Sequence, residues 1–538
     1  MQRIKLKKVC NFRAIFCLFL LVVICIFGAV KCYSNKMYFL LLIFPIAFFV
    51  YVGIKRRFVL LGVSLFVLIG VATFSYTSVH SFSTCELPSG QVAVVATVEK
   101  VTDKGTYYIL NLKDLSYKEG EDTPAKNLVG KGTLFVNATN FDENIERYST
   151  IAFSALFKRK SIEEDSYGMF YLSNNIRYQL NLVFGTKPVL LGRNMNMLEK
   201  FREYNLNLLV DSLGEENGNL CYSILYGDKS YLSTEDLNDY RSTGVVHLFA
   251  VSGLHVGLLV AVIVWVLSKC KVKDKGQFIV IVFFLLVYCL LCSFTPSVVR
   301  ASIMAICLLL SKLFSKKYDP LNALSLAGII LLVLSPMALF STGFQLSFCA
   351  TFGIIFLSRL FGLVHFKNSF MQELWNATRI TISAQMGVAP LMFYYFGWIS
   401  AWTVIANLLL VPLFTLFYVL LFAGNIFAII CPPLQIVAKI PQAIFEMFRY
   451  INSIIVGLPS GTIFFSQIKL PSVVLYFTLL WVSSKYLVVS SKTRGILAIV
   501  LVLGIAFFVI TSKSSVPSNS VAVLEHLENY SKIFLAQK

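Results

Sequence analysis

Long apolar runs constrain this chain more than any other feature. Its 538 residues are 57% hydrophobic and only 14% charged, whereas soluble domains are nearer a quarter charged. A bilayer core of about 30 Å needs roughly 20 apolar residues per helix, and several runs reach that length. The sequence therefore predicts a polytopic α-helical membrane protein, with about 11–13 transmembrane helices.

The apolar runs fall into two groups, separated by a long polar region. Residues 1–76 form the first group, with runs at about 14–30, 37–53 and 58–75. The second group fills residues 245–511. Its candidate helices are 245–267, 277–294, 297–314, 321–340, 342–358, 380–396, 402–424, 441–458, 472–489 and 495–511. The number of crossings within 425–458 stays open, because "CPPLQIVAKIP" interrupts that region.

The net charge of +19 reports membrane topology more than a ligand. Residues 77–241 carry 17 Lys and Arg against 22 Asp and Glu, a balance of −5, while the rest of the chain carries 30 against 6, a balance of +24. The basic linkers 55–57, 268–276, 315–318 and 490–495 share one side if every candidate crosses. Because cytoplasmic loops are rich in Lys and Arg, we expect a cell-membrane protein with a cytoplasmic N-terminus. Residues 77–241 and the C-terminus are then extracellular.

The polar region divides into a β-rich part and a helical part. Residues 77–185 hold four runs of β-branched and aromatic residues, from "QVAVVATVEKV" to "IAFSALFKRK", separated by turn-forming clusters. This pattern is typical of a small β-barrel or sandwich. Residues 186–244 are expected to form a helical extracellular or interfacial connector, and residues 512–538 a short C-terminal tail. Cys85 and Cys221 flank the region and are candidates for a disulfide, which sequence spacing alone does not establish.

Polar residues interrupt the first helix candidate of the second group. The stretch "VVHLFAVSGLHVGLL" places His247, Ser252, Gly253 and His255 in an apolar run. Gly weakens a helix interior by about 1 kcal/mol relative to Ala. One interpretation is a half-helix that lines a polar path. The other is an interfacial helix end with structurally satisfied histidines.

Further polar residues lie inside later candidates. Arg300 follows Pro296 with no acid nearby in sequence, and either snorkels at a helix end or faces a negative ligand. Gln345 sits in "LFSTGFQLSFCATFGI", where small and hydroxyl residues also favour helix packing. Gln385, Pro390 and Asn407 are expected to interrupt two adjacent segments. Broken helices at membrane depth are tolerated only where protein or water surrounds them. Together these residues predict a polar, discontinuous interior.

Several ordered blocks of sequence carry a resemblance to a known family. "STGVVHLFAVSGLHVGLL" resembles the signature of the ComEC family of competence proteins, which are inner-membrane channels for DNA uptake. "YGDKSYLS", "TPSVVRASIMA", "STGFQLSFCATFGI" and "PLMFYYFGWISAWTVIANLLLVPL" are similar to further family blocks, in the family's order, and "YGMFYLSNNIRY" is similar to the end of its extracellular domain. The resemblance covers about residues 10–511.

The resemblance implies a function, partners and a set of channel-lining residues. It implies an OB-like extracellular domain and a membrane channel that passes single-stranded DNA to the cytoplasm. By carry-over, the family's motif positions are occupied by His247, Ser252, Gly253, His255, Arg300, Gln345 and Asn407, and we add Gln385 as a lining candidate. Expected partners besides membrane lipids are a DNA receptor, a cytoplasmic motor ATPase and a separate nuclease. The oligomeric state stays open.

The chain also departs from the family's pattern. Longer members continue into a metallo-β-lactamase-like nuclease domain, and no metal motif of that kind occurs here, so we expect no enzymatic activity, no metal and no cofactor. The acidic exterior lacks the basic footprint of backbone binding. A local patch of Lys158, Arg159, Lys160 and Arg177 is the candidate extracellular DNA contact. Tyr107, Tyr108, Phe135 and Phe141 are aromatics that either stack bases or fill the core.

Two other functions remain open from the sequence. A transporter or envelope protein of the same fold without DNA uptake agrees with the acidic exterior. An intramembrane serine hydrolase is suggested by "AVSG", which is similar to the Gly-x-Ser-Gly motif of rhomboid proteases except at Ala250. A serine nucleophile needs a base within hydrogen-bond reach, and His255 follows Ser252 by only three residues.

Overall fold

The computed structural model describes most of the chain in twelve segments. These are residues 14–35, 58–83, 88, 90–103, 105–119, 124–159, 168–232, 234–361, 365–430, 440–458, 461–464 and 470–483. The expected helices at 37–53 and 495–511, the tail 512–538 and Cys85 lie outside them.

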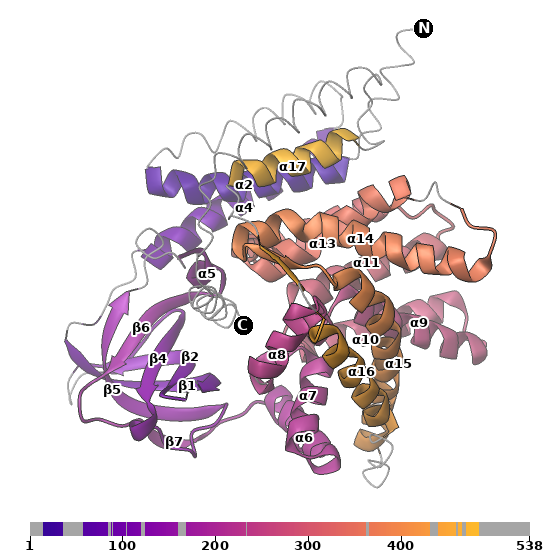
Figure 1. The fold of residues 1–538 in the computed structure, drawn as a ribbon. Helices are drawn as coiled ribbons and strands as arrows, with labels where there is room; N and C mark the ends of the chain where they lie inside the picture. The colour runs from indigo at the N-terminus through magenta and orange to yellow at the C-terminus, as the bar shows by residue number, and fades with distance from the viewer. Residues whose placement is uncertain are drawn as a thin grey trace.

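Five strands between residues 91 and 182 close into a β-barrel (Figure 1). They are β1 (Gln91–Asp103), β2 (Tyr107–Lys118), β4 (Lys131–Asn137), β5 (Ser149–Arg159) and β6 (Ile176–Leu182). The order is β1-β2-β4-β6-β5, and β5 pairs again with β1 to complete the ring. All these pairings are antiparallel except that between β4 and β6, which is parallel. Closure leaves no free edge among the five strands.

Alternating side chains explain why these runs become barrel strands. Along β1, Val92, Val94, Ala96 and Val98 are buried while the residues between them are more exposed. Because successive strand residues point to opposite faces, one face of each strand fills the barrel core. The four runs expected as strands are confirmed as β1, β2, β4 and β5.

Smaller elements decorate the barrel. The short β3 (Lys126–Asn127) pairs with β2, and β7 (Val189–Arg193) pairs with β5. The 3-10 turn η2 (Ala138–Asn140) follows β4, and the helix α5 (Gly168–Ser173) precedes β6. Both β6 and β7 were missing from the expected strands, and β7 lies beyond residue 185. Each takes its partner from a distant strand, which sequence alternation over a few residues does not reveal.

Three helices connect the barrel to the apolar helices. They are α6 (Met197–Leu213), α7 (Glu215–Tyr226) and α8 (Thr234–Ser242), with the 3-10 turn η3 (Lys229–Tyr231) between the last two. Asn196 and Glu199 form a capping box that fixes the start of α6. Cys221 is a buried free thiol in α7.

The apolar part of the chain is helical. Its elements are α2 (Ala14–Asn35), α4 (Phe58–Ser83), η4 (Val246–Phe249), α9 (Gly253–Lys269), α10 (Asp274–Leu291), α11 (Pro296–Leu313), α12 (Pro320–Leu334), η5 (Pro336–Phe340), α13 (Thr342–Phe361), α14 (Ser369–Tyr395), α15 (Thr403–Ile430), α16 (Ile440–Val456) and α17 (Leu470–Ser483). Proline is the first residue of α11 and α12, where its missing N–H is not needed. Within 425–458, α15 ends and α16 packs against it.

The helix breaks do not all fall where the sequence predicts. The 245–267 candidate is broken, since α9 starts only at Gly253. In contrast, α14 runs through Gln385 and Pro390, and α15 runs through Asn407 and Pro412. The expected interruptions at Gln385, Pro390 and Asn407 are therefore wrong. The actual break lies between these two helices, where β8 (Trp398–Ser400) pairs with β9 (Thr462–Phe464).

Two cores hold the helices together. One joins α7, η4, α9, α10, α15 and α16, and the other joins α2, α4, α12, η5 and α13. Figure 1 shows α6, α7 and α8 between the barrel and the α15–α16 pair. These three helices therefore link the β-domain to the first core.

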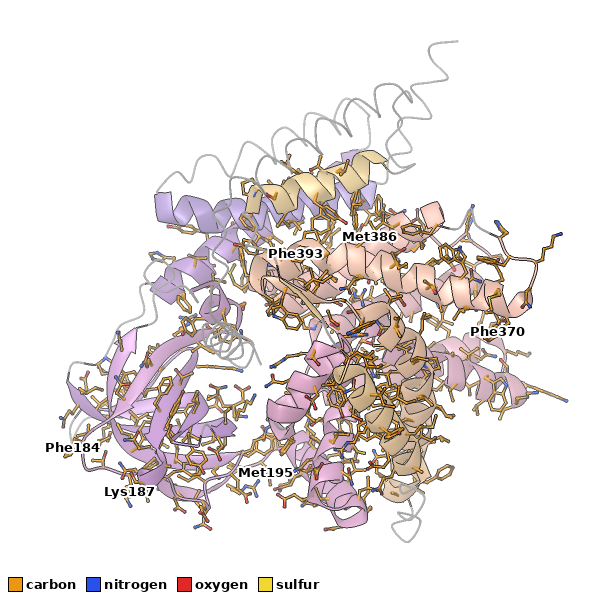
Figure 2. All side chains as sticks on the ribbon, in the orientation of Figure 1. Phe184, Lys187, Met195, Phe370, Met386 and Phe393 are labelled. Atoms are coloured by element: carbon orange, nitrogen blue, oxygen red, sulfur yellow. The ribbon has the colours of Figure 1, made fainter. Side chains whose placement is uncertain are left out.

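The structure is that of a helical membrane protein with a barrel. Among the described residues, α10, α11 and α15 are long and apolar enough to cross a bilayer, and several shorter apolar helices accompany them. Large apolar side chains also point outward, for example Phe283 on α10 and Phe370 on α14, each about two-thirds exposed (Figure 2 labels Phe370). Such apolar surface is suited to lipid contact. The total of about 11–13 crossings stays a prediction.

Candidate functional site around Ser252 and Arg300

The break between η4 and α9 creates a capped helix start. Ala250 and Ser252 are extended, and Ser252 is the N-cap of α9. The Ser252 hydroxyl oxygen accepts a hydrogen bond from the Leu254 N–H at 3.2 Å. The Ser252 N–H donates to Nδ1 of His255 at 2.9 Å. This reciprocal arrangement is a capping box in which histidine takes the place of the usual Glu or Gln.

His255 is sealed among aromatic rings. Its side chain is fully buried, with edge-to-face contacts to Tyr418 at 4.4 Å and Phe414 at 5.4 Å between ring centroids. Because Nδ1 accepts the Ser252 N–H, the ring is neutral and carries its proton on Nε2, which is a buried atom. In this conformation His255 supports the helix start from within the core and does not face an open passage.

Arg300 approaches the same helix start from α11. A Cβ placed on Gly253 would lie 3.0 Å from the Arg300 Nη2 atom, so the guanidinium lies against the first turn of α9. Arg300 is only 7% exposed, and its Nε has no hydrogen-bond partner. Its guanidinium lies 5.9 Å from the ring centroid of Phe348. Within the described part of the chain, no ion pair includes Arg300.

The other predicted lining residues lie in different surroundings. His247 is exposed in η4, and its Nδ1 is 3.2 Å from the Gly244 carbonyl oxygen. Gln345 donates to the Leu339 carbonyl oxygen at 2.9 Å and accepts from the Tyr395 hydroxyl at 2.7 Å. Gln385 is half-buried in α14, and Asn407 in α15 has a buried Oδ1 without a partner. The structure thus gathers Ser252, Gly253, His255 and Arg300, and their lining role stays a prediction.

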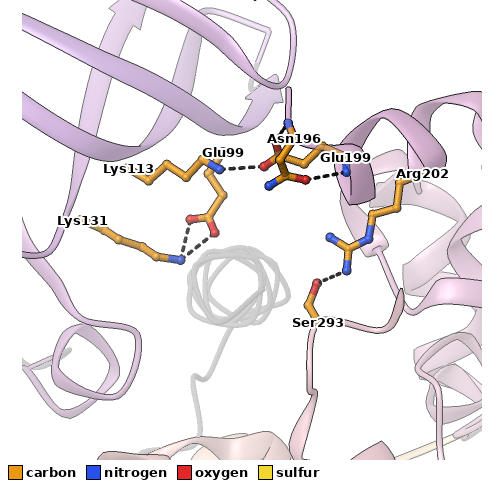
Figure 3. Close-up of polar contacts among 7 residues, drawn as sticks. All are labelled: Glu99, Lys113, Lys131, Asn196, Glu199, Arg202 and Ser293. Atoms are coloured by element: carbon orange, nitrogen blue, oxygen red, sulfur yellow. Dashed lines mark hydrogen bonds and ion pairs between the residues drawn. The ribbon is translucent and has the colours of Figure 1, made fainter. Parts of the chain in front are cut away.

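Polar contacts tie the connector to both the barrel and the membrane helices. Lys113 of β2 pairs with Glu199 of α6 at 2.8 Å (Figure 3). One turn later, the Arg202 Nη2 donates to the carbonyl oxygens of Leu290 and Leu291 and to the Ser293 hydroxyl at 2.7–2.9 Å. A cation is favourable at a helix C-terminus, so Arg202 anchors α6 to the end of α10. Sequence reading missed this link, because nothing local marks the two partners.

A second link joins the barrel to the segment that follows α7. Arg147, in the loop before β5, forms an ion pair with Asp228, and the Ser230 N–H donates to Asp228 at 3.1 Å. Burial disfavours the charged form of Asp228, but Arg147 and Ser230 outweigh it and hold the pKa of Asp228 below its usual range. The "YGDKSYLS" motif was the only sequence signal for this contact.

The predicted basic patch on the barrel is only partly present. Lys158 is exposed, whereas Lys160 and the side chain of Arg159 lie outside the described residues. The prediction that Arg177 belongs to a surface patch is wrong, because this residue is 8% exposed and its Nε donates to the Asn175 side chain at 2.9 Å. Its aliphatic stem lies against Gly130, whose added Cβ would meet it at 2.6 Å. Arg177 therefore supports the β4–β6 side of the barrel.

The aromatics of the barrel separate into two pairs. Tyr108 and Phe141 stack on each other with ring centroids 3.8 Å apart, and Phe141 packs against the barrel core. Tyr107 and Phe135 are closer to the surface, 6.2 Å apart, with Phe135 37% exposed. No group of three or more His, Cys, Asp or Glu within the described segments could hold a metal ion.

Comparison with known proteins relates the second helix group to one family. The family model described as "Competence protein" matches residues 224–489. "ComE operon protein 3" of Bacillus subtilis (strain 168) is 31% identical over 280 residues, which are 51% of this chain and 35% of that protein. "Recombination protein 2" of Haemophilus influenzae is 25% identical over 222 residues, 39% of this chain and 28% of the relative. No solved structure matches the chain.

A third relative covers a larger share of its own length. An uncharacterized protein of Aquifex aeolicus is 26% identical over 260 residues, which are 48% of this chain and 60% of the relative. The match to the Bacillus protein spans about a third of that protein's length. The matched residues 224–489 include the helix break at Ser252, Arg300 and the Gln345 contact. Residues 224–489 therefore form a competence-protein region, similar in sequence to these Bacillus and Haemophilus proteins.

Proposed function

We propose that this protein is a membrane channel component that translocates single-stranded DNA across the cytoplasmic membrane during natural transformation. The observation that carries the proposal is the family match, which covers the helices that assemble the Ser252–Arg300 site. A buried cation beside a broken helix is suited to a path for a polyanion.

The barrel supports a role in handling the strand before it enters. Its five strands close with a parallel β4–β6 pair, and we assign it to the OB-like class, whose second and third strands bind oligonucleotides. Here those strands are β2 and β4, which carry the outward pair of Tyr107 and Phe135. Lys113 and Lys131 on the same strands are already paired with Glu199 and Glu99. We therefore propose base stacking on the aromatic pair rather than phosphate binding.

The proposed orientation places the barrel outside the cell. The turn between α9 and α10 carries four lysines and one aspartate in "SKCKVKDKG", which favours the cytoplasmic side. Since α9 and α10 are joined by this short turn and pack together, Gly253 and Leu291 lie at the opposite end. That end contacts the connector through Arg202. The Ser252–Arg300 site then faces the extracellular entrance, with the N-terminus in the cytoplasm and the C-terminus outside.

Partners complete the proposed system. A DNA receptor, a motor ATPase and a separate nuclease would supply capture, energy and strand removal. The competing proposal is a transporter or envelope protein of this family without DNA uptake, which the net negative charge of residues 77–241 favours. Deleting the gene and following labelled DNA into a nuclease-protected cytoplasmic pool separates the two.

The sharpest test compares two arginines. Arg300→Met is expected to abolish uptake while the protein level in the membrane stays normal. Arg449 is a matched control, since it is already paired with Glu216 at 2.9 Å, and Arg449→Met is expected to retain uptake. Normal DNA uptake in the Arg300→Met strain would contradict the channel proposal.

A hydrolase is the second candidate, because the Ser252 hydroxyl lies 2.9 Å from Nδ1 of His255. We propose that this contact serves the helix cap, since the same Nδ1 also accepts the Ser252 N–H. A fluorophosphonate probe tests the alternative, with Ser252→Asn as the control that removes the hydroxyl but preserves capping. Labelling that disappears in Ser252→Asn would favour a hydrolase.

A further inference from the structure

We propose that Arg300 and the first turn of α9 form a binding site for a phosphoryl anion, occupied during transport by a phosphodiester of the DNA strand. The identity of the anion as DNA phosphate rests on the proposed function. The anion site itself rests only on the geometry around Gly253.

The first step is the unpaired charge of Arg300. Its guanidinium is 7% exposed, with an unpartnered Nε. A buried charge is normally paired, because water no longer solvates it. The ring of Phe348 at 5.9 Å offsets only part of the cost of burying this charge, through a cation–π contact. A bound anion would pair with the buried guanidinium of Arg300.

The second step is the position of the α9 N-terminus. Helix N-termini carry partial positive charge and free N–H groups. In α9 the Leu254 N–H is used by the Ser252 cap, whereas the Gly253 N–H makes no hydrogen bond within the described part of the chain. Arg300 lies against this same turn. Two positive groups therefore converge on one point, and the planar guanidinium is suited to two oxygens of a phosphoryl group.

The third step is the space that Gly253 leaves. A Cβ at residue 253 would lie 3.0 Å from Nη2 and 4.0 Å from Cζ of Arg300. Gly257, one turn later in α9, has nothing within 4 Å of its Cβ position. Ser252 and Gly253 are partly exposed, so a small anion can reach the turn. The chain thus offers a matched pair of glycines, of which only one lies at the site.

The experiment uses the purified full chain in detergent. The unfolding midpoint is measured in phosphate-free buffer and with rising inorganic phosphate, against chloride at equal ionic strength. A bound ligand at about 100 times its dissociation constant stabilises measurably, so the wild type is expected to shift upward by several degrees. Arg300→Met is expected to lose this shift, and its midpoint without phosphate is expected to equal or exceed that of the wild type.

The glycine pair keeps the test decisive if Arg300→Met does not fold. Gly253→Ala is expected to lose the phosphate shift while keeping the arginine, and Gly257→Ala is expected to keep it. A phosphate shift that persists in Arg300→Met or Gly253→Ala overturns the site. So does a folded wild type that shows no shift over chloride.

Separate arms identify the source of the phosphoryl group. Single-stranded oligothymidylate is expected to shift the wild type but not Gly253→Ala, which supports the site on the DNA path. If only phosphatidylglycerol in phosphatidylcholine nanodiscs raises the unfolding midpoint, the site does not lie on the DNA path and binds a lipid headgroup instead. These binding measurements use purified protein and test the anion site, whereas DNA uptake in cells tests the proposed function. A failure of one is therefore distinguishable from a failure of the other.

Discussion

Arg147 of the barrel forms an ion pair with Asp228, which lies 81 residues later, directly after Gly227 at the end of α7. About a fifth of each side chain is exposed. With the Lys113–Glu199 pair, this contact fixes the barrel to the connector at two separate points. The barrel is thereby held next to the segment that leads into the η4–α9 break.

Replacing Asp228 by Asn is expected to weaken the attachment of the barrel. Hydrogen bonds to charged groups contribute about 1.5–3 kcal/mol, and Arg147 would lose the carboxylate with which it forms an ion pair. A double-mutant cycle with Arg147→Met, followed by chemical unfolding, measures the coupling. Glu99→Gln is the control, because the Lys131–Glu99 pair at 2.6 Å joins two strands of the barrel and does not join the barrel to the connector. Coupling below about 0.5 kcal/mol would refute the role of this pair.

The same pair predicts a pH dependence. The folded-state pKa of Asp228 is lowered, since Arg147 and Ser230 outweigh the effect of burial. A lowered folded-state pKa means that the ionised carboxylate stabilises the fold. This stabilisation is fully present above the unfolded pKa of about 3.9 and is lost as the pH falls through the folded pKa. The stability difference between wild type and Asp228→Asn is therefore expected to be constant from pH 7 to about pH 5 and to vanish in stronger acid. A difference that already shrinks between pH 7 and about pH 5 would contradict this assignment.

Gly353 and Gly387 bring α13 and α14 into backbone contact. A Cβ at Gly353 would lie 2.7 Å from the Gly387 Cα, and a Cβ at Gly387 would lie 2.9 Å from the Gly353 Cα. Small residues allow such close approach of membrane helices. Gly353→Ala is expected to lower stability by about 1–3 kcal/mol, the range for overpacking. Gly343→Ala in the same helix meets nothing within 4 Å, so its unfolding midpoint should be nearly unchanged.

Gln345 joins α13 to α14 through Tyr395. Gln345→Leu is expected to cost about 1–3 kcal/mol, because it leaves the Leu339 carbonyl and the Tyr395 hydroxyl without their partner. Adding Tyr395→Phe removes one of these orphaned groups and should recover part of the loss. If Gln345 also lines the DNA path, uptake stays impaired in the double variant despite its recovered stability. Uptake that recovers in step with stability would limit Gln345 to a packing role.

Much of the architecture follows from local sequence patterns. Alternation of apolar residues predicts β1, β2, β4 and β5, because each strand must bury one face whatever its partner is. Closure of the barrel depends instead on β6, which pairs in parallel with β4 and antiparallel with β5. Those pairings join residues that are distant in sequence, so no local pattern carries them.

At the candidate site, too, some features follow from local sequence and others depend on distant helices. From the sequence, Ser252 and Gly253 mark a weak point in the predicted helix 245–267, since Gly disfavours a helix interior. The start of α9 at Gly253, with Ser252 as its cap, is a finding of the structure. The expected break at Pro390 is wrong because neighbouring helices in a membrane compensate for a missing N–H, and α14 continues through this proline. The expected break at Asn407 is wrong because asparagine keeps its backbone N–H, and α15 continues through it.

The sequence by itself determined that the chain enters a membrane, that its polar region forms strands, and which of its stretches resemble competence proteins. Hydrophobic length and side-chain alternation are local properties, and they depend only on what each segment must bury. Only the tertiary structure decided that Arg300 lies against Gly253, that His255 is sealed beside Tyr418, and that Arg177 is buried. The direction and partner of a polar side chain depend on how distant helices pack, and that information lies in no single stretch of sequence.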